Sequence, residues 1–153
     1  MGEPVSIRLA NEADAGVIHD LTHAAYAKWI EVAGRSPLPM TVDYAQAVRQ
    51  HRFDLLYAGE VLAALIETTP DGDQLLIVNV AVHPGFQGHG FGVRLLKLAE
   101  DLAAGAGLAG TRLYTNKLFE PNIRLYAALG YRIDREEVLE RGTVVHMSKA
   151  LKG

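Results

Sequence analysis

The sequence predicts an α/β domain built on one mixed sheet. The chain has 153 residues, of which 49% are hydrophobic and 22% charged, as in a single soluble globular domain. Segments with the two-residue alternation of strands follow segments with helical spacing in the order βα(α)βββαβαββ. No repeat, low-complexity tract or linker interrupts this order, so we expect one domain over residues 1–153.

The first strand and the first helix are predicted from two apolar periods. Apolar and polar residues alternate over 5–10, which is the period of a strand. From Ile18 apolar side chains recur every three or four residues, which predicts an amphipathic helix that ends at about Trp29. Asn11 or Asp14 can cap this helix at its start.

A loop, a short helix and a hairpin are expected next. Residues 34–39 contain one glycine and two prolines, which is typical of a loop, and 43–51 has the pattern of a short helix. Two apolar segments, 53–58 and 61–69, flank a Gly-Glu pair and predict a hairpin. The Pro-Asp-Gly-Asp sequence at 70–73 predicts a turn.

The second half of the chain begins with a nearly continuous apolar segment. This strand, 74–82, is expected to be central in the sheet and covered on both faces. Beyond the glycine-rich segment that follows it, we expect a helix over about 90–104, a strand over 111–115, a helix over 122–129 ended by Gly130, and closing strands over 131–135 and 143–148.

Composition excludes several classes of protein. A formal net charge of −3 leaves no basic excess for nucleic acid. The absence of cysteine excludes disulfides, thiolate metal sites and a cysteine nucleophile. We expect no membrane span and no signal peptide, because apolar runs are short and residues 1–6 lack a basic and then apolar pattern. The expected location is cytoplasmic.

The glycine-rich segment between a buried strand and a helix predicts a phosphate-binding cradle. Glycines let the backbone approach a ligand, and free amides at a helix N-terminus favour anions. The dinucleotide fingerprint fails, because its third glycine would fall on Val93 counted from Gly88, or on Leu95 counted from Gly90. The P-loop pattern fails as well, because Phe91 replaces its lysine.

Two segments, 87–92 and 122–131, contain motifs that resemble those of the GCN5-related N-acetyltransferases, the GNAT family. The segment 34–40, followed by Asp43 and Tyr44, resembles a stretch in many small bacterial members of unassigned substrate. Gln87, Gly90 and Gly92 match the pyrophosphate motif Gln/Arg-x-x-Gly-x-Gly/Ala, which follows the strand sequence Val-Ala-Val-x-Pro. The segment 122–131, Asn-Ile-Arg-Leu-Tyr-Ala-Ala-Leu-Gly-Tyr, resembles the family's C-terminal element. Tyr126 follows Gly92 by 34 residues, in the order the family has.

The resemblance implies a mixed, mostly antiparallel sheet with a splayed central V, helices on both faces, and acetyl-CoA as co-substrate without a metal. The pantetheine arm is expected between the strands 74–82 and 111–115. Many relatives have arginine where Gln87 stands, and Arg94, Lys97 or Lys117 would then supply the positive charge. The cofactor-binding residues that the resemblance implies are Val80, Ala81, Val82, Gln87, Gly88, His89, Gly90, Phe91, Gly92, Val93, Asn122 and Tyr126.

The resemblance also implies a catalytic role for Tyr126, as the general acid that protonates the leaving thiolate. The alternative is a structural ring beside the cofactor, and Asn122 is either a cofactor contact or a helix cap. A backbone amide near Val82 is expected to stabilise the oxyanion.

The general base has no assigned residue. The positions where some relatives carry an acid or histidine hold Leu76 and Val78, and Asn79 can only hold a water molecule. Glu67, Tyr114 or ordered water remain as candidates, and both side chains are interpreted as solvent-facing strand residues.

The acceptor is expected to bind opposite the cofactor. Aromatic residues and one arginine gather in the first helix and the loop after it, either as a small-molecule pocket or as core. The predicted substrate-binding residues are Tyr26, Trp29, Arg35, Met40, Tyr44 and Asn79. A small amine or amino acid is the first expectation, and a protein N-terminus or lysine the second. His19 and His23 have metal-ligand spacing, but a third ligand is not evident.

The sequence therefore predicts an N-acetyltransferase that moves the acetyl group of acetyl-CoA to a primary amine by direct attack in a ternary complex. The alternatives are a non-catalytic acyl-CoA-binding sensor and an acyltransferase with a longer acyl donor. We expect no nucleic-acid or membrane partner, and dimerisation is common in the family.

Overall fold

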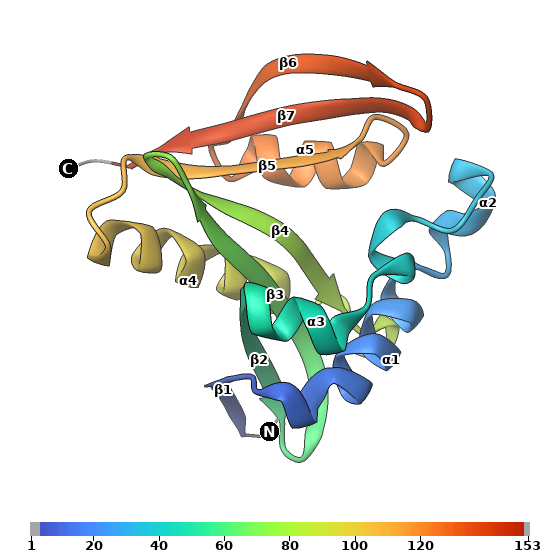
Figure 1. Cartoon of the computed structure of the whole chain (residues 1–153), viewed down its shortest axis with the longest axis vertical. Helices are drawn as coiled ribbons and strands as arrows, with labels where there is room; N and C mark the ends of the chain where they lie inside the picture. Colours follow the sequence, from blue (N-terminus) through green and yellow to red (C-terminus); the bar gives the residue numbers. More distant parts are fainter. Residues whose placement is uncertain (1–3, 152–153) are drawn as a thin grey trace.

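The computed structural model describes residues 4–151, which form one seven-stranded sheet with helices on both faces (Figure 1). The strands are β1 (Val5–Leu9), β2 (Arg52–Ala58), β3 (Val61–Asp71), β4 (Gln74–Val82), β5 (Gly110–Asn116), β6 (Arg132–Leu139) and β7 (Gly142–Ala150). The helices are α1 (Ala15–Tyr26), α2 (Trp29–Ala33), α3 (Tyr44–Gln50), α4 (Phe91–Gly105) and α5 (Glu120–Ala128), with short 3₁₀ turns η1 (Glu12–Asp14), η2 (Leu38–Thr41) and η3 (Pro84–Phe86). The strand order is β1-β2-β3-β4-β5-β7-β6.

The sheet opens at its centre. Among the described strands, β4 and β5 form the parallel pair, and every other pairing is antiparallel. Their register covers Gln74–Ile77 opposite Gly110–Leu113 and then stops, although both strands continue. Figure 1 shows the two strands diverging beyond this point. The expected mixed sheet with a splayed central V is confirmed.

A β-bulge at Val78 changes the face that β4 presents. Glu67 of β3 lies opposite Asn79, whereas the next residue, Thr68, lies opposite Ile77, so Val78 is the extra residue. Ile77 therefore packs with α4 on one face, while Ala81 packs with the α1 cluster on the other. The bulge turns Asn79 toward the second face, which becomes important at the site.

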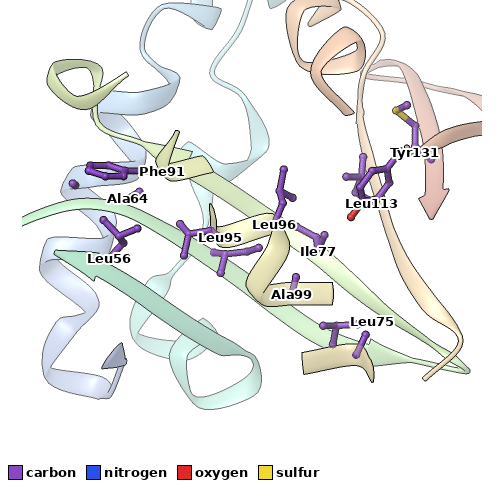
Figure 2. Packing of buried hydrophobic residues seen from close by; sticks show 14 of the residues in the cluster. Leu56, Ala64, Leu75, Ile77, Phe91, Leu95, Leu96, Ala99, Leu113 and Tyr131 are labelled. Carbon is purple, nitrogen blue, oxygen red and sulfur yellow. The ribbon is translucent and has the colours of Figure 1, made fainter. Parts of the chain in front are cut away.

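Two hydrophobic clusters hold the helices to the sheet. On one face α4 packs Leu95, Leu96 and Ala99, at most 2% exposed, against β3, β4 and β5 (Figure 2). On the other face α1 and α3 cover the sheet through Ile18 and Tyr44 among others. Complete burial of one leucine side chain stabilises the fold by about 1.5–3 kcal/mol. These clusters fix β4 from both sides, as its apolar sequence predicted.

Several boundaries differ from the sequence prediction. The first helix ends at Tyr26, and a separate short helix, α2, begins at Trp29. The hairpin strand β3 continues through Pro70 and Asp71, because the turn needs only the positive φ of Gly72 (63°) and its neighbour. The closing strands β6 and β7 are both longer than predicted. β6 is an exposed edge strand, so its polar residues do not alternate with apolar ones and the pattern does not mark where the strand ends.

Candidate active site

A cavity of about 660 Å³ lies where β4 and β5 separate. Its walls come from β3, β4 and β5, from α1 and α3 with the segment between them, from α5, and from the β6–β7 turn. The predicted site residues that line it are Tyr26, Arg35, Tyr44, Asn79, Val80, Asn122 and Tyr126. Side chains far apart in the sequence thus meet in the opening of the sheet.

Two of the predicted acceptor residues lie outside this lining. The Trp29 ring packs on Phe119, with ring centroids 4.5 Å apart. Met40 lies in η2, where its amide donates to the carbonyl of Pro37 at 2.9 Å. Both side chains are partly buried against the protein, so they support the wall of the cavity instead of facing into it.

Tyr26 and Asn79 form a polar contact inside the cavity. The hydroxyl of Tyr26 donates to Asn79 Oδ1 at 2.6 Å, and it lies 3.4 Å from the carbonyl of Val80. Burial raises the pKa of Tyr26 far above its ordinary value, so the phenol stays protonated. Asn79 is 5% exposed, and its Nδ2 is a buried donor without a partner among residues 4–151.

Tyr126 lies on α5 and faces the cavity. Burial raises the pKa of its phenol to about 12, with a smaller contribution from the charge of Tyr131. The group therefore holds its proton at neutral pH and can donate it. Asn122 is inside the first turn of α5, because the helix begins at Glu120 and its N-cap is Phe119. Of the two alternatives for Asn122, the helix cap is wrong, and its side chain lines the cavity.

A buried histidine–glutamate pair lines the same cavity. Nδ1 of His51 lies 2.6 Å from Oε2 of Glu67, whose side chain is only 5% exposed. Burial raises the pKa of Glu67, and the hydrogen bond from His51 acts in the opposite direction. The interpretation of Glu67 as a solvent-facing strand residue is wrong, because Glu67 is buried on the face of the sheet that α1 and α3 cover. Tyr114 is 43% exposed, as that interpretation expected.

The glycine-rich segment forms an open helix N-terminus at the end of β4. Gly90 is the N-cap of α4 in the left-handed conformation, with φ 75°, and among the described residues no side chain caps it. The backbone amide of Arg94 donates the first helical hydrogen bond, to the carbonyl of Gly90 at 3.0 Å. The backbone amides of Phe91, Gly92 and Val93 therefore have no partner inside the helix. A Cβ on Gly88 or Gly90 would meet nothing within 4 Å. This cradle fits an anion.

The side chains in this segment have separate roles. Phe91 is buried in the core, so it offers a ligand its backbone only, as does Ala81 in β4. Gln87 and His89 are exposed to solvent, and Nδ1 of His89 lies 2.9 Å from the carbonyl of Phe86. The start of α4 lies close to the end of β4, because a Cβ on Gly92 would be 3.5 Å from Cγ2 of Val82.

Of the three cations expected to compensate for Gln87, two have acid partners. Lys97 lies 3.2 Å from Asp101, and Lys117 lies 2.9 Å from Glu136. Arg94, in the first turn of α4, has no carboxylate within ion-pair distance among residues 4–151. It is the cation that the helix start leaves for an anionic ligand.

A metal-binding group and a membrane-spanning helix are both absent from the described residues. The His19 and His23 rings lie 4.0 Å apart, but the described residues contain no group of three or more histidine, cysteine or acidic side chains that could hold a metal ion. None of the described helices is long and apolar enough to cross a membrane.

An uncapped helix start after a central strand, beside a sheet that opens into a cavity, is the arrangement expected of an acyl-CoA-dependent transferase. The model of the acetyltransferase (GNAT) family matches residues 18–131, and the chain belongs to this family of N-acetyltransferases. A search of curated proteins found no match.

Solved structures of the same fold cover nearly the whole chain. The PaiA N-acetyltransferase of Thermoplasma acidophilum, in complex with coenzyme A, is 16% identical with a TM-score of 0.80, and the match covers 97% of this chain and 99% of that one. The ribosomal-protein-S18-alanine N-acetyltransferase of Escherichia coli is 20% identical (TM-score 0.78; 98% and 97% covered). YncA of Salmonella typhimurium, solved with its cofactor acetyl-CoA, is 21% identical (TM-score 0.75; 99% and 96% covered).

Proposed function

We propose that the chain transfers the acetyl group of acetyl-CoA to a small primary amine that carries a carboxylate. One observation carries the donor half of this proposal. β4 passes along the cavity, and the segment 83–90 then leads from its end to the open helix start of α4. A ligand with a pyrophosphate at one end and a reactive thioester at the other fits both places. Acetyl-CoA has this form, and the structures of PaiA and YncA hold coenzyme A and acetyl-CoA.

The residues that would hold the donor follow from the unused backbone groups. The amides of residues 87–93 face the pyrophosphate, where the helix dipole and Arg94 favour negative charge. Beyond Ile77 the β5 side of β4 has no strand partner, so the backbone of Val80, Ala81 and Val82 is open to the amides of the pantetheine arm. Asn122 adds a polar side chain at the cavity.

The reaction in this arrangement is direct attack. The neutral amine nitrogen forms a bond to the thioester carbon, and a backbone amide of β4 near Val82 stabilises the oxyanion. The carbon–sulfur bond then breaks, and Tyr126 gives its proton to the leaving thiolate. The amide nitrogen loses a proton that returns to the tyrosinate. Because burial keeps the Tyr126 phenol protonated, it suits the role of acid.

The charges at the cavity rim support the carboxylate of the acceptor. Arg35 and Arg141 both line the cavity, and neither has a carboxylate within ion-pair distance among residues 4–151. Of the three acids in the lining, Asp43 accepts from the first amides of α3 and Glu67 is paired with His51. The remaining acid is Glu140. The two arginines are therefore cations of the lining that have no acid partner among the described residues, and they can bind the carboxylate of an acceptor amine.

A contact across the rim supports a small acceptor over a protein. Nη2 of Arg141, in the β6–β7 turn, donates to the carbonyl of Ser36 at 3.2 Å. These two segments, 105 residues apart in the sequence, both line the cavity, and the contact joins them. A lining whose segments are joined in this way favours a small acceptor, and a protein N-terminus is the second candidate.

The test is a panel of amines measured by release of free thiol from acetyl-CoA. Each amino acid is compared with the amine that lacks only the carboxylate, such as phenylalanine with phenethylamine. We expect a higher kcat/KM for the amino acid, and we expect Arg35→Gln and Arg141→Gln to remove that preference by about tenfold or more each. Arg132→Gln, an exposed arginine outside the cavity, is the matched control. Equal rates for the two members of every pair would contradict the proposal.

A further inference from the structure

We propose that His51 is the base that takes the proton from the acceptor amine, and that Glu67 positions it. This inference rests on the proposed acetyl transfer to an amine. It assigns a residue to the step that the sequence left open, and the assignment depends on a pair that only the folded chain brings together.

The pair comes from two elements that meet at the cavity. His51 is the C-cap of α3 and precedes β2, while Glu67 lies in β3, which pairs with β2. The two side chains are joined by the 2.6 Å contact between Nδ1 and Oε2. Both line the cavity that Val80 and Tyr126 also line. The side chain of His51 is 30% exposed and that of Glu67 only 5%. His51 is therefore the member that reaches the ligand space.

The hydrogen bond determines which nitrogen can act as the base. An ionised carboxylate only accepts hydrogen bonds, so Nδ1 of His51 carries the hydrogen. Nε2 then presents its lone pair, and among residues 4–151 it has no hydrogen-bond partner. A histidine fixed in this tautomer by a carboxylate accepts a proton at Nε2, and the carboxylate stabilises the imidazolium that forms.

Asn79 gives an independent sign that a polar ligand occupies this part of the cavity. It lies directly opposite Glu67 in the β3–β4 register, because the Val78 bulge turns it to this face. Its side chain is buried, its Oδ1 accepts from Tyr26, and its Nδ2 has no partner in the described chain. Buried donors are nearly always satisfied in folded proteins. An acceptor atom of a bound ligand, or of a water molecule that accompanies it, satisfies this one.

The proton transfer balances with the rest of the reaction. The ammonium form of the acceptor loses one proton to Nε2 of His51, directly or through one water molecule, and becomes the nucleophile. After product release the imidazolium returns this proton to solvent. The second proton of the amine nitrogen goes to the Tyr126 oxygen, which has already protonated the thiolate. The sum is one amide, one free thiol and one proton released.

The other ionisable groups near the His51–Glu67 pair are neutral phenols or members of an ion pair. Burial raises the pKa of Tyr26 of α1 and of Tyr44 of α3, that of Tyr44 to about 12, and the charge of Glu67 acts in the same direction, so both phenols stay neutral. On β2, Arg52 and Asp54 form a closed ion pair at 2.9 Å. An acid limb in the rate is therefore a property of the His51–Glu67 pair.

The experiment compares His51→Asn and Glu67→Gln with a matched control. Asparagine keeps a donor near the position of Nδ1 and removes the base. His146 and Glu137 form another His–carboxylate pair, at 2.9 Å, and neither lines the cavity, so His146→Gln is the control. Acetyl-CoA affinity by calorimetry and thermal midpoints are measured on every variant. This separates a folding defect from a lost base.

We expect His51→Asn to lower kcat by about 100-fold or more with an amine of ordinary basicity, while the acetyl-CoA affinity stays within about twofold. The acid limb of the rate should disappear in His51→Asn, which lacks the base, and Glu67→Gln should lower kcat because the imidazolium loses its counter-charge. With methoxyamine, which is neutral near pH 7, the loss in His51→Asn should shrink to a few-fold, since no proton has to be removed before attack.

Two results would overturn the assignment, and they differ. If the wild type acetylates amines and His51→Asn keeps the acid limb and the rate of His146→Gln, the pair is structural and only the base is wrong. If the wild type binds acetyl-CoA but acetylates no amine of the panel, the proposed function fails and the base fails with it.

Discussion

The substitution Gly90→Glu tests the anion cradle, and Gly107→Glu is its matched control. Both glycines have a left-handed backbone, with φ 75° and 74°, and an added Cβ meets nothing within 4 Å at either. A side chain in this conformation costs about 1–2 kcal/mol of folding free energy. The two variants should therefore lose similar stability. They differ in place, because Gly90 begins α4 and Gly107 follows its end.

Only Gly90→Glu should lose affinity for acetyl-CoA. A carboxylate at about 5 Å from one phosphate charge costs about 3 kcal/mol at an effective dielectric constant of ~20. Solvent and salt reduce this repulsion at the exposed loop, so we expect a loss of about 1–3 kcal/mol, or about 5- to 150-fold in Kd. Calorimetric titration with acetyl-CoA measures the affinity, and thermal unfolding measures the stability. Wild-type affinity in Gly90→Glu, or an equal loss in Gly107→Glu, would refute the cradle.

The remaining predictions concern the general acid, the core and the buried carboxylate of Asp14. Tyr126→Phe should lower kcat about 100-fold without changing the Kd for acetyl-CoA, and an unchanged kcat would contradict the role of Tyr126 as the acid. Burial raises the pKa of Tyr126 to about 12, so the wild-type rate should not fall near pH 10, where a free phenol ionises. Leu95→Ala should lower the free energy of unfolding, measured in urea, by about 2–5 kcal/mol, and Leu125→Ala by about 0.5 kcal/mol or less. The reason is that Leu95 is fully buried, whereas Leu125 is 41% exposed. Equal losses of stability in the two variants would contradict the assigned core. Arg8 holds the pKa of Asp14 below its usual value, so Asp14→Asn should have a lower free energy of unfolding than the wild type at neutral pH. This difference should close as pH falls through the folded pKa of Asp14. A difference in unfolding free energy that is constant with pH would be inconsistent with the ion pair.

The parts of the fold that were predictable are those specified by local sequence. The apolar run of β4, the glycines after it and the amphipathic α4 are continuous in the chain, so their order alone predicts a cradle between a strand and a helix. The start of α5 was missed by two residues, although Pro121 at the first turn is a readable signal for it.

The parts that were not predictable depend on strand register. Glu67 reads as an exposed strand residue until β2 brings His51 beside it and α3 covers it. Asn79 faces the cavity only because Val78 forms a bulge, which changes the face of every later residue in β4. Trp29 was predicted to bind the acceptor because aromatic residues gather in its segment. It packs instead on Phe119, which lies 90 residues further along the chain.

The measurement that tests the central claim most directly uses acetyl-CoA carrying an isotope-labelled acetyl group. The protein is mixed with the amine panel, and mass spectrometry follows the label in the amines, in acetate and in the protein. The account predicts one labelled acetyl group on an amine for each free thiol released, with none on the protein. Thiol release accompanied only by labelled acetate, or label that resides on the protein before it reaches an amine, would contradict direct transfer.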